Sequence, residues 1–131
     1  MEILNVIVAA LAAFAFGAVW YMSMSKAWIA AAEVPVDANG KPQGNGSVMP
    51  FVVGLVAMVI VAGMMRHVFA MSGLTTIIGG VKGGAGIGAF LITPWVAMNY
   101  AFGMRKPALT LIDGVNSVVG CTIMGAVLNL F

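Results

Sequence analysis

Four long apolar stretches are the feature that most limits how this 131-residue chain folds. They run roughly over residues 3–21, 51–71, 75–102 and 109–131. A helix of about 20 apolar residues is long enough to cross the hydrocarbon core of a bilayer. The chain is 62% hydrophobic and only 8% charged, whereas soluble domains carry about 25% charged residues. We therefore predict an all-α membrane protein, with residues 1–131 forming a single domain of four transmembrane helices in an antiparallel bundle.

The connection between the first two stretches, residues 33–50, is the main hydrophilic segment. Pro, Gly, Asn and Asp cluster there without an apolar period, which is typical of a loop. Four cationic residues belong to the same side of the membrane as this loop: Lys26, Lys41, Arg105 and Lys106. Because cytoplasmic connections are enriched in Lys and Arg, we expect a multi-pass protein of a bacterial inner membrane with both termini on the periplasmic side.

The glycine-rich segment GGVKGGAGIGAF, residues 79–90, allows two interpretations. Gly84, Gly86 and Ala89 match the dinucleotide-binding pattern G-x-G-x-x-G/A, but that turn follows a strand and has an acidic residue about 20 positions later. Here the flanking residues are typical of a membrane helix, and no acidic residue follows before Asp113. We therefore favour a helix whose flank, almost bare of side chains, lets another helix approach closely.

Small residues at helical spacing mark the predicted packing faces on three of the four stretches. Their partner helices are expected within the chain or in a second copy of it. These residues are Ala9, Ala13, Gly17, Gly79, Gly80, Gly83, Gly84, Gly88, Ser117, Cys121 and Gly125.

Polar residues at membrane depth form a second group of candidates. Four of them lie in the third and fourth stretches: Thr93, Asn99, Asp113 and Asn116. We favour hydrogen bonds between helices for this group, and the alternative is a polar path for a solute. For Asp113 we expect local pairing with Arg105 and Lys106, or a position as an anion near a helix N-terminus.

Two further features concern the ends and the shape of the helices. Arg66, His67 and Lys82 are candidates for binding a lipid headgroup, and the simpler interpretation is that Lys82 snorkels to the interface. Pro94 lacks an amide hydrogen and clashes with the carbonyl of Phe90, so a kink is predicted in the third helix.

Composition and motifs also exclude several function classes. The chain has one His and one Cys, so we predict no metal site. No nucleophile, base and orienting group occur together, and we predict neither an enzyme nor a cofactor. The net charge of +2 comes from scattered residues, so nucleic acid is not an expected partner. The leading hypothesis is association in the membrane, as a homo-oligomer or an accessory subunit of a larger complex, and the alternative is a small solute or ion permeation protein.

A family resemblance covers nearly the whole chain. The first apolar stretch ends in G-A-x-W-Y (17–21) and is followed by K-A-W (26–28), the third contains Pro94 and then Asn99-Tyr100, and the fourth contains Asn116 and Gly125. This pattern resembles a family of small bacterial integral membrane proteins known only as a domain of unknown function. The resemblance implies a four-helix membrane domain, and it supplies no established activity, ligand or catalytic residue.

Overall fold

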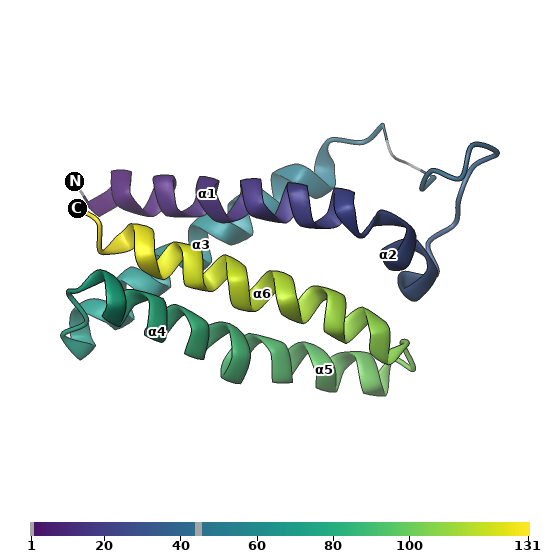
Figure 1. The fold of residues 1–131 in the computed structure, drawn as a ribbon. Helices are drawn as coiled ribbons and strands as arrows, with labels where there is room; N and C mark the ends of the chain where they lie inside the picture. The colour runs from purple at the N-terminus through teal and green to yellow at the C-terminus, as the bar shows by residue number, and fades with distance from the viewer. Residues whose placement is uncertain (1, 44–45) are drawn as a thin grey trace.

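The computed structural model describes residues 2–43 and 46–131, and every regular element within these ranges is helical (Figure 1). In chain order they are α1 (Glu2–Ser23), α2 (Ser25–Ala32), α3 (Met49–Ser72), α4 (Ile77–Ile87), the π-helical turn η1 (Gly88–Ile92), α5 (Thr93–Phe102) and α6 (Pro107–Leu128). The described part of the chain has four helices long and apolar enough to cross a membrane: α1, α3, the continuous run Ile77–Phe102, and α6. The predicted all-α fold with four membrane-spanning helices is therefore confirmed. Met1 and positions 44 and 45 of the predicted loop lie outside the described residues.

Residues with strong helix-ending or helix-starting preferences set the boundaries of these elements. Gly73 ends α3 with a positive φ of 68°, a conformation that costs glycine little. The Thr76 side chain then caps α4 by accepting from the amide of Gly79 over 3.0 Å. Pro107 is the first residue of α6, where a missing amide hydrogen leaves no bond unmade. The sequence thus ends one span and starts the next within a few residues.

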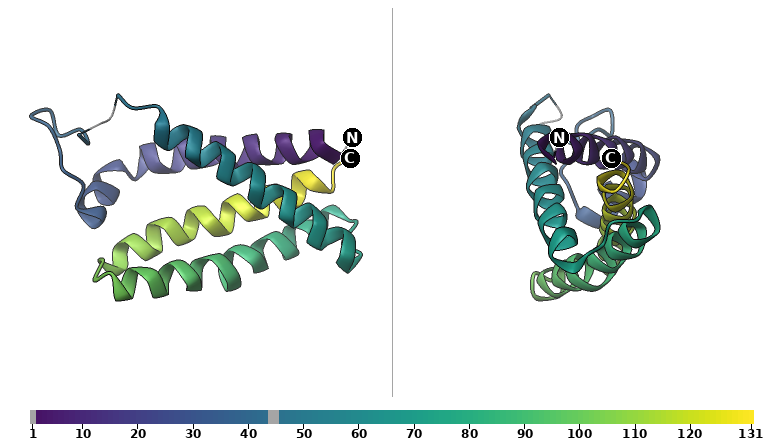
Figure 2. Two further views of the ribbon diagram at one scale, coloured as in Figure 1. Left: turned by 180° about the vertical axis from the view of Figure 1, so that it is seen from behind. Right: turned by 90° about the vertical axis from the view of Figure 1, so that its left-hand side faces the viewer.

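Helix α6 is the centre of the bundle and contacts every other helical element. Helices α4 and α5 run along one side of it and α1 along the other, so that the start of α1 and the end of α6 lie together at one end of the molecule (Figure 1). We call this end the termini end, and the opposite end, with α2 and the α5–α6 connection, the loop end. Helix α3 crosses α1 obliquely and has smaller contacts with α6 and α4 (Figure 2). The main buried cluster consists of Ala9, Ala10, Ala13, Ala62, Met65, Phe69, Cys121, Met124 and Leu128.

The glycine-rich segment is helical and packs against α6 through backbone atoms. A Cβ atom at any of three glycines on α4 and η1 would overlap a carbonyl oxygen of α6. The facing pairs are Gly80 with Gly125, Gly84 with Cys121, and Gly88 with Ser117. We refer to these three pairs as the glycine seam. Helices this close gain dispersion and Cα–H···O contacts, which are the main attractions left where lipid removes the hydrophobic effect.

The remaining predicted packing glycines of α4 have different neighbours. A Cβ at Gly83 would meet the Phe69 ring of α3 and the Leu74 side chain, whereas one at Gly79 would meet only the Thr76 cap and Leu74. Gly79 therefore lies beside its own helix start and not at a contact with another helix, because it is one position off the row that faces α6.

A π-helical turn, η1, lies directly before Pro94. The Thr93 amide bonds to the carbonyl of Gly88, and the Thr93 hydroxyl donates to the same oxygen over 2.7 Å. This wider turn gives the proline ring room, and the Gly88 carbonyl oxygen accepts both bonds from Thr93. The kink at Pro94 stays a prediction.

Candidate functional site

A carboxylate held by two phenols lies near the loop end of the bundle. The Tyr21 hydroxyl donates to Oδ1 of Asp113 and the Tyr100 hydroxyl donates to Oδ2, each over 2.5 Å. The indole of Trp20 donates to the Ile112 carbonyl oxygen over 3.0 Å. These donors come from α1 and α5 and the acceptors from α6. The polar cluster of Tyr21, Tyr100 and Asp113 therefore joins three helices at one depth.

The chain topology explains why these residues meet. Tyr21 is in the last turn of α1 and Tyr100 in the last turn of α5. Four residues, 103–106, separate α5 from α6, so Asp113 in the second turn of α6 returns to the depth of Tyr100. Neither tyrosine was among the predicted site residues, although Asp113 was. The available signal was that both tyrosines and the carboxylate belong to the same membrane end.

Arg105 and Lys106 bond to α2 and not to Asp113, so local pairing, the first of the two roles expected for Asp113, is not formed. The Arg105 guanidinium donates to the carbonyl oxygen of Ala32, and Lys106 Nζ donates to that of Ala30 over 3.0 Å. Both acceptors belong to the last turn of α2, where carbonyl groups have no partner within the helix and the helix dipole is negative. The two cations therefore fix α2 against the start of α6.

Asn116 extends the polar cluster toward the middle of the bundle. Its Oδ1 lies 3.2 Å from the position that a Cβ on Gly17 would occupy, and its amide group is also beside the Tyr21 hydroxyl. Asn116 Oδ1 is buried and has no hydrogen-bond partner. The predicted small residue Gly17 thus leaves space for a polar side chain of α6.

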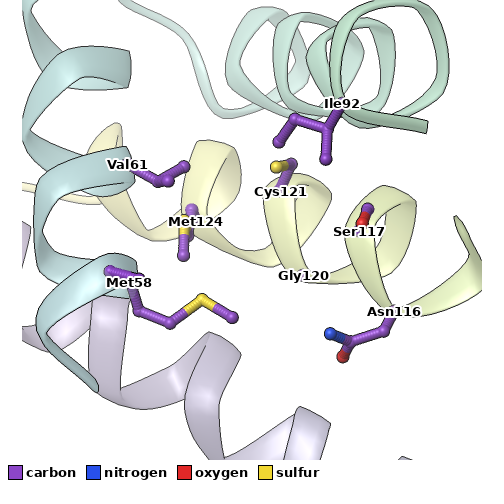
Figure 3. Close-up of a pocket in the computed structure, with 9 residues that line it drawn as sticks. Met58, Val61, Ile92, Asn116, Ser117, Gly120, Cys121 and Met124 are labelled. Carbon is purple, nitrogen blue, oxygen red and sulfur yellow. The ribbon is translucent and has the colours of Figure 1, made fainter. Parts of the chain in front are cut away.

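A cavity of about 150 Å³ lies beside Asn116, between α3, η1 and α6 (Figure 3). Met58 of α3 and Asn116 of α6 reach toward the same space, and Cys121 points toward Val61 and Ile92 (Figure 3). The lining residues are Ala57, Met58, Val61, Ile92, Asn116, Ser117, Gly120, Cys121 and Met124. The cavity is therefore apolar except where α6 contributes an amide and a hydroxyl.

The four predicted intramembrane polar residues do not share one location. Asp113 and Asn116 lie together on α6, but the Thr93 hydroxyl bonds within its own helix and Asn99 is exposed on α5. Asn99 lies one turn from the end of α5. Of these four residues, Asn116 lines the cavity described above, and Thr93, Asn99 and Asp113 do not.

The predicted headgroup candidates lie toward the termini end. One of them, Arg66, bonds to other residues of the chain. Arg66 forms an ion pair with Glu2 at 3.5 Å and donates to the Leu128 carbonyl oxygen over 3.3 Å. His67 and Lys82 are exposed. Sequence analysis also missed Asn5, which is only 3% exposed, because a single amide near the start of an apolar stretch gives no periodic signal.

The small-residue faces predicted on α1 and α6 both pack against other helices of the same chain. Ala9, Ala13 and Gly17 are buried in α1, and the face of α6 that carries Ser117, Cys121 and Gly125 forms the second half of the glycine seam. The small residues therefore serve contacts between helices of one copy.

This arrangement defines the protein as an all-helical, multi-pass membrane protein with a polar cluster at one end and a lateral cavity beside it. A family model matches most of the chain. The model described as "Protein of unknown function (DUF1761)" matches residues 4–129, and the chain belongs to that family. No curated protein and no solved structure shows significant similarity to this chain.

Proposed function

We propose that this protein is a non-enzymatic protein of the bacterial inner membrane that acts by associating with other membrane-spanning helices. The partner is a second copy of the chain or the subunit of a larger complex to which it is an accessory. The observation that supports this proposal is the position of α3, which packs mainly along α1 and presents an open apolar face. Membrane lipids are its other partners.

The open face of α3 is a continuous ridge. Val53, Val56, Ile60 and Met64 recur at intervals of three and four residues, and each is more than half exposed. This spacing places them on one side of the helix, opposite Ala62 and Met65, which are buried against the bundle. We call these four residues the α3 ridge. Since the glycine seam and the alanines of α1 are used inside the chain, the ridge is the face that supports an association role.

Cysteine cross-linking in native membranes tests this proposal. The variant Ile60→Cys, in a Cys121→Ala background, places one thiol in the middle of the α3 ridge. Leu111→Cys in the same background is the matched control, because Leu111 is on α6 and is 71% exposed against 66% for Ile60. We expect Ile60→Cys to form a cross-linked dimer, or a cross-link to one other membrane protein, at several times the yield of Leu111→Cys. Equal yields for the two positions would contradict the proposal.

A non-catalytic role has support from the chemistry of the polar residues. The Ser117 hydroxyl donates to the Asp113 carbonyl of its own helix over 3.0 Å, and Cys121 is buried. The Asp113 carboxylate accepts from two tyrosines, so its oxygens serve contacts between helices. Side chains committed in this way are poorly placed to act as nucleophile or base.

The proposed orientation puts both termini in the periplasm. Lys26, Lys41, Arg105 and Lys106 belong to the connections at the loop end, and such residues favour the cytoplasmic face. A C-terminal alkaline phosphatase fusion, which is active only in the periplasm, is expected to be active. A C-terminal green fluorescent protein fusion that fluoresces would reverse the assignment.

A further inference from the structure

An apolar groove runs along η1 and the first turn of α5. Its volume is about 330 Å³, and it is lined by Leu91, Ile92, Trp95 and Val96. Among the described elements, α5 contacts only α6 and the adjoining η1, and it has no buried residue, so it lies at the edge of the bundle (Figure 1). In the described part of the chain, no other helix covers the groove, and it is therefore open to the bilayer.

The helix face that carries the groove continues to a polar group near the end of α5. Ile92, Val96 and Asn99 are spaced by four and three residues, which places them on one side of the helix. The Asn99 amide is exposed there. An amide group that faces lipid is costly without a hydrogen-bond partner. Outside the protein, the ester groups of a phospholipid supply acceptors for it.

Two cations follow directly after this face. Arg105 and Lys106 are both exposed in the α5–α6 connection. A Cβ at Gly103, one turn after Asn99, would lie 3.6 Å from Cγ of Arg105, so the stem of this arginine lies against the end of α5.

Both cations keep donors and charge for an anion. Arg105 and Lys106 each donate to one carbonyl oxygen of α2, whereas a guanidinium group has five N–H donors and an ammonium group three. Within the described residues, neither cation has a carboxylate oxygen within 4.0 Å. Their positive charge is therefore not compensated by the protein.

We propose that the groove, Asn99 and the two cations together bind one anionic phospholipid. The phosphate bonds to Arg105 and Lys106, an ester group accepts from the Asn99 amide, and an acyl chain lies in the groove beside Trp95. Basic residues beside the ends of membrane helices favour anionic headgroups. This site lies at the loop end, opposite to the headgroup candidates predicted from the sequence, and it is independent of the α3 ridge.

Other occupants match the site less well. A zwitterionic phospholipid fills the groove equally, but its own ammonium group compensates its phosphate and leaves the two protein cations without a counter-charge. A soluble phosphate ion bonds to the cations and leaves the groove empty. A helix of another protein covers the groove, yet nothing about an apolar helix supplies an anion at its end. An anionic phospholipid meets both requirements with one molecule.

Quenching of Trp95 fluorescence by brominated lipids tests this proposal. The full chain is reconstituted in phosphatidylcholine vesicles that contain a small fraction of either phosphatidylglycerol or phosphatidylcholine with brominated acyl chains. The difference between the unsubstituted chain and Trp95→Phe isolates the signal of Trp95 from that of the other two tryptophans.

We expect brominated phosphatidylglycerol to quench the Trp95 signal several times more strongly than brominated phosphatidylcholine. Two basic residues beside one anionic headgroup favour it by roughly tenfold or more, and this preference is expected to fall at high salt. Equal quenching by the two lipids, or a preference that salt leaves unchanged, would overturn the proposal. Absence of quenching by either lipid, as a covering helix would produce, would also overturn it.

Three variants locate the headgroup. Arg105→Gln/Lys106→Gln is expected to abolish the preference for phosphatidylglycerol. Lys26→Gln/Lys41→Gln removes the same charge from the same end and is expected to keep the preference, as is Asn99→Leu, because both lipids have the same ester groups. Loss of the preference in either control would mean that it does not come from the two cations and would overturn the site. Since these cations also fix α2, the salt dependence of the unsubstituted chain tests their charge if the paired variant does not fold.

Discussion

Along the glycine seam α4 and α6 touch through their backbones, whereas α3 touches α1 through side chains and leaves a cavity on the side facing α6. Within an apolar 18-residue stretch of each helix, 39% of the residues of α6 are buried but only 11% of those of α3. Backbone contact permits one arrangement of the two helices, because a carbonyl group cannot move aside as a side chain can. Contact through side chains permits adjustment. The difference indicates that the seam fixes the relative position of α4 and α6, whereas α3 is less closely packed against the rest of the bundle.

The largest predicted effect concerns the middle of the glycine seam. In Gly84→Ala the new methyl group overlaps the Cys121 carbonyl oxygen, so α4 and α6 must move apart. We expect a loss of about 3 kcal/mol in the free energy of unfolding, at the upper end for overpacking. Reversible unfolding by SDS in mixed micelles measures it.

The control for this variant lies half a turn away on the same helix. At Gly86 a Cβ has no neighbour within 4 Å, and replacing a helical glycine by alanine gains about 0.5–1 kcal/mol. Gly86→Ala is therefore expected to be neutral or stabilising. A Gly84→Ala protein as stable as Gly86→Ala would show that the seam is not a backbone contact.

The second prediction tests whether the polar cluster adds to the attachment of α6. Asp113→Leu removes the acceptor of two half-buried tyrosine hydroxyls. It is expected to lower the free energy of unfolding by about 2 kcal/mol, because both donors lose their partner. In a Tyr21→Phe/Tyr100→Phe background the same change is expected to cost much less. The double-mutant cycle of unfolding free energies isolates this coupling, and additive effects would show that the tyrosines and Asp113 do not interact.

A smaller effect is expected at the polar anchor of α3. Arg66 of α3 forms an ion pair with Glu2 of α1 and donates to the Leu128 carbonyl oxygen of α6. In the described part of the chain, these are the side-chain bonds that join α3 to other helices. Because the Glu2 side chain of this ion pair is exposed, Arg66→Met is expected to lower the free energy of unfolding by only about 0.5 kcal/mol. Hydrogen exchange is expected to rise in the last turns of α3, near Arg66, while α6 keeps its protection. Equal loss of protection in α6 would show that α3 and the seam unfold as one unit.

The features that the sequence predicted follow from local chemistry. The length of the spans and the bare flank of Gly80, Gly84 and Gly88 depend on residues close together in the chain. A strand and an acidic residue were missing around the glycine-rich segment, which was enough to favour a helix over a phosphate-binding turn.

The features that it did not predict depend on how each helix is rotated about its axis. Asn99 and Asn116 look alike in sequence, yet one is exposed and the other lies beside the cavity. Helix α3 is apolar on every side up to Arg66, so its buried residues there, such as Met65, cannot be told from exposed ones, such as Met64, by residue type. In lipid the outward face carries the same residues as the inward face, and the usual hydrophobic period is lost.

The smallest predicted effect is at a glycine of α3. It tests directly whether α3 is less closely packed than the glycine seam. A Cβ at Gly63 would lie 3.9 Å from Cγ1 of Val6 on α1, an ordinary van der Waals distance. Gly63→Ala is therefore expected to leave the free energy of unfolding unchanged or to raise it by about 0.5 kcal/mol, because higher helix propensity and an ordinary new contact both favour the folded state. Gly63 and Gly84 are both helical glycines at a contact between spans, so composition alone predicts equal sensitivity. The structure predicts a difference of about 3 kcal/mol between their alanine variants, because only Gly84 faces a backbone. Equal destabilisation in the same SDS titration would mean that α3 is as closely packed as the seam, and the cavity and the open ridge would then lose their structural basis.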